Sequence, residues 1–144
     1  MAKDGKHIIH AGGVFPNPLL NREGAAAAST PPGTIGFFSA ADKFTASVDG
    51  NEAAILYVAN KDYLRCLSVD DAIPAGELVV GIQPLPGMFL NVRAAAGTYT
   101  KGQALSIANG RVKVAAGDES VRCYVEEDKS YTAAAGDLLR VVIK

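Results

Sequence analysis

The sequence predicts a mainly β protein: a small β-sandwich or barrel of short antiparallel strands, preceded by an extended N-terminal arm. Short runs of β-branched and aliphatic residues recur at a spacing of roughly ten residues, with turn-forming residues between them, as in sandwiches and small barrels. The 144 residues include 15 glycines and 7 prolines, which interrupt any long helical pattern. This length suits one domain that can bury a substantial core.

The expected arm comprises residues 1–36. Glycine and proline recur at positions 11–13, 16–18 and 31–33, so no regular element extends far, although residues 23–28 are compatible with a short helical turn. The apolar residues come in pairs rather than at helical or strand spacing. They are Ile8, Ile9, Val14, Phe15, Leu19 and Leu20. We therefore expect an extended segment that lies over a surface, either that of its own body or that of a neighbouring molecule.

The expected body comprises residues 37–144, a series of strands and turns. Its first two strands are expected to be joined by the turn at residues 49–51, and residues 70–72 are compatible with one helical turn. The strongest hairpin signal is Asn109-Gly110, because both residues tolerate positive φ. The expected strands are residues 44–48, 54–58, 63–69, 78–82, 88–92, 104–108, 111–114, 121–126 and 138–143.

One turn pattern occurs three times in the body, at residues 74–80, 100–107 and 134–141. In each segment a small or polar residue and a glycine precede an acidic or amide residue, and a strand follows. Glycine allows backbone conformations in such turns that other residues avoid. The spacings are unequal, so the pattern indicates a repeated turn and not a solenoid or a site.

Charge and cysteine content limit the classes of partner. Fourteen Lys and Arg stand against fifteen Asp and Glu, which gives a formal net charge of −1 and argues against a nucleic-acid partner. No stretch approaches the roughly 18 apolar residues of a membrane span, and no signal peptide is expected. Cys66 and Cys123 lie in strand-like runs. They are expected to be buried free thiols in a reducing compartment.

The sequence contains no pattern that predicts catalysis, a metal site or a cofactor. His7 and His10 are the only histidines, and no other ligand stands near them at metal-binding spacing. The acidic clusters at residues 70–71 and 126–128 follow expected strands and are interpreted as solvated loops. A small hydrolase that uses these carboxylates, and a ligand- or carbohydrate-binding β module, stay open as alternatives.

The C-terminal half resembles a known protein family. The matching residues are Ile82-Gln83-Pro84-Leu85-Pro86-Gly87, Arg93 through Leu105, Asn109-Gly110-Arg111-Val112 and Ala135 through Val141. Together they resemble the head decoration, or cement, proteins of tailed bacteriophages over about residues 75–144. The resemblance implies a small β protein without enzymatic activity that binds the outer surface of an icosahedral capsid and reinforces it.

Together, the arm and the resemblance predict a structural virion protein. Its expected partners are the major capsid protein and further copies of itself, as a trimer or dimer, with no nucleic acid or membrane. It is expected to be made in the host cytoplasm and to function on the capsid surface. No catalytic, cofactor-binding or metal-binding residues are expected. The expected partner contacts are Ile8, Ile9, Phe15, Leu19 and Leu20.

Overall fold

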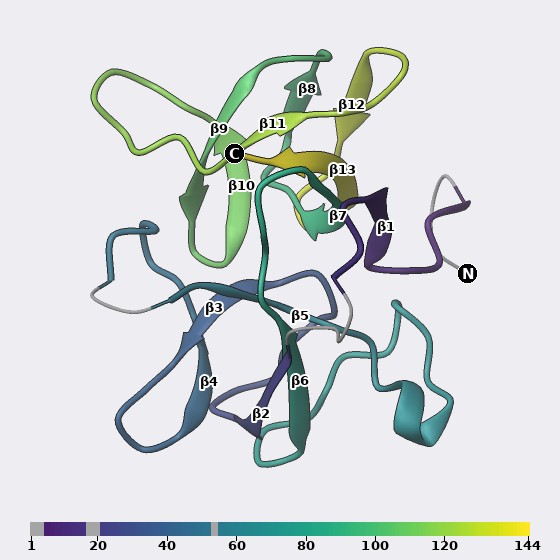
Figure 1. Ribbon diagram of the computed structural model, residues 1–144, viewed down its shortest axis with the longest axis vertical. Coiled ribbons are helices and arrows are strands. Elements are labelled where there is room, and N and C mark those ends of the chain that lie inside the picture. Colours follow the sequence, from purple (N-terminus) through teal and green to yellow (C-terminus); the bar gives the residue numbers. More distant parts are fainter. Residues whose placement is uncertain (1–4, 17–20, 53–54) are drawn as a thin grey trace.

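The computed structural model describes residues 5–16, 21–52 and 55–144 and is built from strands, with no α-helix among those residues. A five-stranded closed barrel and a six-stranded antiparallel sheet lie one above the other, and a two-stranded ribbon extends from the sheet (Figure 1). The prediction of a mainly β fold built from short strands is confirmed. Most strand pairs are antiparallel, as expected, and one pair in the barrel is parallel.

The six-stranded sheet has the order β1-β7-β13-β11-β9-β10, so β1 and β10 are its edges. Its strands are β1 (His10–Gly13), β7 (Met88–Arg93), β9 (Ala104–Ala108), β10 (Arg111–Val114), β11 (Cys123–Val125) and β13 (Leu138–Ile143). The separate ribbon pairs β8 (Gly97–Tyr99) with β12 (Tyr131–Ala133). The predicted Asn109-Gly110 hairpin is confirmed: β9 and β10 are joined there, and both residues have positive φ.

The barrel closes in the order β2-β4-β3-β5-β6. Its strands are β2 (Asn21–Ala26), β3 (Ile35–Phe38), β4 (Lys43–Ala46), β5 (Tyr57–Ala59) and β6 (Leu78–Ile82). Phe38 packs edge-to-face against Phe44 and Tyr57 inside the barrel. Gly36 makes room for this packing, since a Cβ atom there would lie 2.3 Å from a carbonyl oxygen of β4 and 2.8 Å from the Phe44 ring.

The barrel and the sheet share one apolar core. Ile35, Val58 and Ile82 of the barrel belong to the same buried cluster as Leu90 and Val141 of the sheet. Burial of this shared surface holds the two parts together.

Arg93 adds polar contacts across the junction between the barrel and the sheet. Its Nε donates to the carbonyl oxygen of Pro32 at 2.6 Å, Nη1 to that of Gly136 at 2.9 Å and Nη2 to that of Val69 at 2.5 Å. Burial lowers the pKa of Arg93. One side chain therefore joins three segments that are far apart in the sequence.

Three local predictions are wrong. The segments 44–48 and 54–58 do not form a hairpin, because β4 and β5 pair with opposite edges of β3. Residues 63–69 are not a strand: they begin with the 3-10 turn η2 (Tyr63–Arg65), which the Asp62 carboxylate caps. Residues 23–28 are not helical but lie largely in β2, whose strand partners supply the backbone hydrogen bonds. The strands β1, β3, β8 and β12 were also not predicted.

The N-terminal segment runs in extended conformation along the molecule's own body. β1 pairs with β7 in the six-stranded sheet, and β2 pairs with β4 and β6 in the barrel. The sequence pattern changes at residue 36, the expected boundary between arm and body. The strands before that residue, β1 and β2, nevertheless belong to the same sheet and barrel as the strands after it. The sequence left open whether this segment covers its own body or a neighbouring molecule. Its described residues lie on their own body.

The two cysteines differ in environment. Both are free, as expected, but only Cys123 is buried. Cys66 is exposed because it follows η2 in a left-handed conformation, with a φ of 57°, instead of lying in the expected strand.

Candidate partner-contact surface

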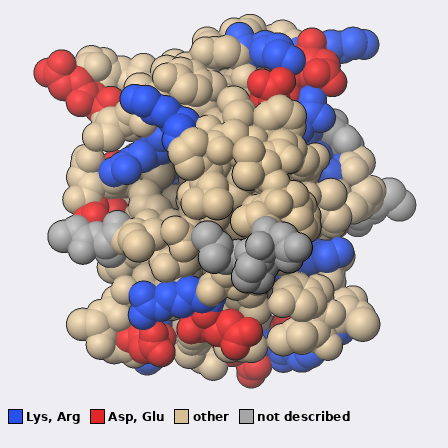
Figure 2. All heavy atoms as spheres, in the orientation of Figure 1, with Lys and Arg blue, Asp and Glu red and all other residues tan. Residues whose placement is uncertain are grey.

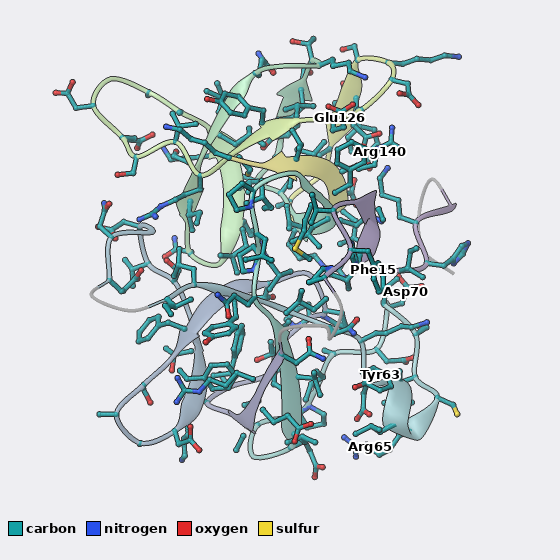
Figure 3. The ribbon with its side chains drawn as sticks, viewed as in Figure 1. Phe15, Tyr63, Arg65, Asp70, Glu126 and Arg140 are labelled. Atoms are coloured by element: carbon teal, nitrogen blue, oxygen red, sulfur yellow. The ribbon has the colours of Figure 1, made fainter. Side chains whose placement is uncertain are left out.

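Three exposed apolar side chains flank the edge strand β1 along the chain. Ile8 is 50% exposed, Val14 47% and Phe15 70%. We call these three residues the N-terminal patch. Phe15 lies beside β1 (Figure 3), whose outer edge pairs with no other strand of its sheet. Exposed apolar clusters of this kind are typical of protein contact sites.

The Phe15 ring is held in place and does not project freely. It stacks on the His10 ring, with the ring centroids 4.6 Å apart and the planes within 11°. The Nε2 atom of His10 lies 3.1 Å from the carbonyl oxygens of both Gly12 and Val14, in position to donate to them. The Val14 amide in turn donates to the carbonyl oxygen of Gly87 at 3.0 Å.

Glycine is required at position 13 for this arrangement. Gly13 has a φ of +73°, and a Cβ atom there would lie 2.1 Å from the carbonyl oxygen of Gly87. Only a residue without a side chain can therefore bring the chain this close to the β7 side of the sheet and turn Phe15 back over His10.

Ile9 fastens the patch to the body. Its side chain is fully buried in the core shared by sheet and barrel. Its carbonyl oxygen accepts a hydrogen bond from the backbone N–H of Asn91 at 2.7 Å. The Asn91 side chain donates from Nδ2 to the carbonyl oxygen of Ile8, also at 2.7 Å. Ile9 is therefore fixed in the core, whereas the side chain of the preceding Ile8 is half exposed.

The predicted contact residues therefore have different outcomes. Ile8 and Phe15 are exposed, one on each side of β1. Ile9 is not available to a partner, because it is buried in its own core. Leu19 and Leu20 lie outside the described residues. The prediction missed Val14, although its position between Gly13 and Phe15 was visible in the sequence.

The acidic cluster at residues 126–128 is engaged with cations. Glu126 pairs with Lys101 at 2.8 Å, Glu127 with Lys6 at 3.0 Å and Asp128 with Arg140 at 3.1 Å. The Arg140 guanidinium holds the pKa of Asp128 below its usual range. Glu126 and Arg140 lie in the upper half of the molecule (Figure 3). These carboxylates lie in a loop, as the sequence predicted; Asp128 is exposed, whereas Glu126 and Glu127 are partly buried.

Charged atoms are distributed unevenly on the face shown in Figure 2. Acidic and basic side chains gather near its upper and lower ends, and much of the centre carries neither. Within the described parts of the chain, no group of three or more His, Cys, Asp or Glu is placed to hold a metal ion. Nor does any helix in residues 5–16, 21–52 and 55–144 have the length and hydropathy needed to cross a membrane.

No protein-family model matches the chain, and no curated protein matches its sequence.

Proposed function

We propose that this protein is a non-enzymatic structural component of a tailed-bacteriophage virion, which binds the major capsid protein on the outer surface of the head and stabilises it. The observation that carries the proposal is the N-terminal patch: three exposed apolar side chains that flank the edge strand β1, one of them a stacked aromatic ring. The resemblance of residues 75–144 to capsid decoration proteins supplies the partner.

The patch suits a contact that is weak in each copy. Burying a large apolar side chain contributes about 1.5–3 kcal/mol, so the exposed parts of Ile8, Val14 and Phe15 together offer about 3–5 kcal/mol. Little ordering entropy opposes this gain, because the His10 stack and the Ile9 anchor hold the patch before binding.

Assembly multiplies this modest energy. A capsid presents many identical sites, and an oligomer that bridges neighbouring capsomers engages several of them at high effective concentration. We propose a trimer or dimer for this role. Its edge strand β1 offers backbone groups of the kind that β proteins commonly use in association. Such a protein is made in the host cytoplasm and ends on the capsid surface, and needs no cofactor, nucleic acid or membrane.

A carbohydrate-binding module is less well supported. Such modules stack sugars on several exposed aromatic rings of one face, whereas Phe38 packs edge-to-face against Phe44 and Tyr57 inside the barrel.

The experiment is cosedimentation of the purified protein with expanded capsids that lack it. Phe15→Ser removes the most exposed side chain of the patch and is expected to weaken binding at each site roughly tenfold to thirtyfold, the equivalent of about 1.5–2 kcal/mol. Val48→Ser is the matched control, because Val48 is 67% exposed but lies on the loop after β4. Its binding is expected to equal that of the wild type.

Thermal unfolding must show that both variants are folded. Equal binding by Phe15→Ser and the wild type would contradict the role of the patch. Failure of the wild-type protein to sediment with capsids would contradict the proposed function itself.

A further inference from the structure

A second feature of the molecule is an apolar cavity between the barrel and the six-stranded sheet, lined by none of the residues of the N-terminal patch. Its volume is about 460 Å³, within the range of about 300–1,000 Å³ that is typical of small-molecule sites. Val58 of the barrel and Val92 and Val141 of the sheet line it, and all three are almost fully buried. Ile55 also lines it and is 59% exposed, so the cavity reaches the surface there.

The charged side chains that line the cavity are basic. Arg122 and Lys144 are the charged residues that line it among the described parts of the chain, and both are exposed. We propose that the cavity binds a single-chain aliphatic carboxylate, such as a medium-chain fatty acid, with the hydrocarbon chain against the valines and the carboxylate at Arg122. This inference goes beyond capsid binding and does not depend on it.

The Arg122 side chain is held in place at the rim. One of its guanidinium nitrogens, Nη2, donates to the carbonyl oxygen of Gly50. The Arg122 amide donates to the carbonyl oxygen of Leu105 at 2.9 Å, and the Lys144 amide donates to that of Arg122 at 3.2 Å. A guanidinium carries five N–H donors, so the contact with Gly50 leaves others that can face a carboxylate.

The interior of the cavity favours a hydrocarbon chain over a polar ligand. Its deep wall includes Cys123, and burial raises the pKa of this thiol to about 12. The thiol is therefore protonated and neutral at pH 7 and behaves as a small apolar group. A sugar or nucleotide placed there would lose hydrogen bonds to water without replacement by the valine side chains.

The test is isothermal titration of the free, full-length protein with octanoate, decanoate and dodecanoate, each below its micelle concentration. Each methylene that enters the cavity is expected to tighten the Kd about fourfold, until the cavity is full. Arg122→Gln is expected to weaken decanoate binding about tenfold and to leave the binding of decanol unchanged, because decanol carries no charge.

Filling the cavity tests its location. Val121 is half-buried and lines the cavity outside any strand, so Val121→Trp is expected to abolish binding. Val114→Trp is the matched control, since Val114 is exposed on β10 and does not line the cavity; it is expected to bind as the wild type does.

Three results would overturn the proposal: no saturable binding of any of the three carboxylates, a Kd that is independent of chain length, or equal losses for decanoate and decanol in Arg122→Gln. The last comparison remains decisive if the tryptophan variant fails to fold. None of these measurements involves a capsid, so their outcome is separate from that of the cosedimentation experiment.

Discussion

Arg93 offers the sharpest test of how the barrel and the sheet are held together. Its guanidinium donates to three carbonyl oxygens, on Pro32, Val69 and Gly136, at distances of 2.5–2.9 Å. Arg93→Met keeps much of the apolar stem but leaves all three acceptors without this partner. A hydrogen bond to a charged group contributes about 1.5–3 kcal/mol, and partial access of water to the vacated site offsets some of the loss. The expected destabilisation is about 3–5 kcal/mol.

The assay is urea unfolding, supported by calorimetry. For a chain of this length, 1 kcal/mol shifts Tm by about 3–4 °C, so Arg93→Met is expected to lower Tm by roughly 10–20 °C. Arg93→Lys keeps the charge but cannot reach three carbonyls, so it should recover part of the loss.

Arg22→Met is the matched control. Arg22 forms an exposed ion pair with Asp42 at 3.0 Å and lies over the Phe38 ring. Its replacement is expected to cost about 1 kcal/mol. A loss below about 1 kcal/mol in Arg93→Met, or no difference between the two variants, would refute the assigned role of Arg93.

Three further predictions concern packing, pH and thiol reactivity. Gly36→Ala is expected to destabilise the protein by about 2–3 kcal/mol in urea unfolding, because its Cβ atom would lie 2.3 Å from a β4 carbonyl oxygen. The control Gly97→Ala makes only ordinary van der Waals contacts and should change stability little. Equal effects of the two substitutions would contradict the packing argument. Hydrogen bonds from a lysine, a backbone amide and a serine lower the pKa of Glu119 to about 2, so its stabilising effect is present above pH 4.5 and is lost as the pH falls from 4.5 through 2. Glu119→Gln should therefore flatten the dependence of Tm on pH in that window, and an unchanged slope would contradict the assignment. Ellman's reagent should modify only Cys66 in the native protein and also Cys123 after unfolding; two reactive thiols in the native state would contradict the burial of Cys123.

Local signals in the sequence account for part of the fold. The β9–β10 hairpin was predictable because Asn109-Gly110 determines its turn by itself. The wrong prediction at residues 63–69 also has a local cause: Asp62 caps η2 through its carboxylate, and an acidic residue before a short turn is a signal that could have been used.

Long-range pairing accounts for what the sequence did not predict. The parallel contact of β2 with β4, and the insertion of β3 between β4 and β5, close the barrel. No short motif encodes either pairing, because both depend on which hydrophobic faces meet in the folded molecule.

The candidate site was likewise predictable where local signals decide it and not where long-range contacts do. Paired aliphatics identified the N-terminal segment as unusual, and Phe15 and Ile8 are indeed exposed. The sequence could not show which of Ile8 and Ile9 faces outward, because that depends on how β1 pairs with β7. The stack of His10 on Phe15 depends on the conformation at Gly13 and had no signal in the sequence.

The most direct test of the central claim is an image reconstruction of virions at a resolution that shows side chains. We predict density for this protein on the outer surface of the capsid, with Phe15 and Ile8 buried against the major capsid protein. Absence of the protein from intact particles would contradict the proposed function. Density that leaves these two side chains facing solvent would contradict the assigned contact surface.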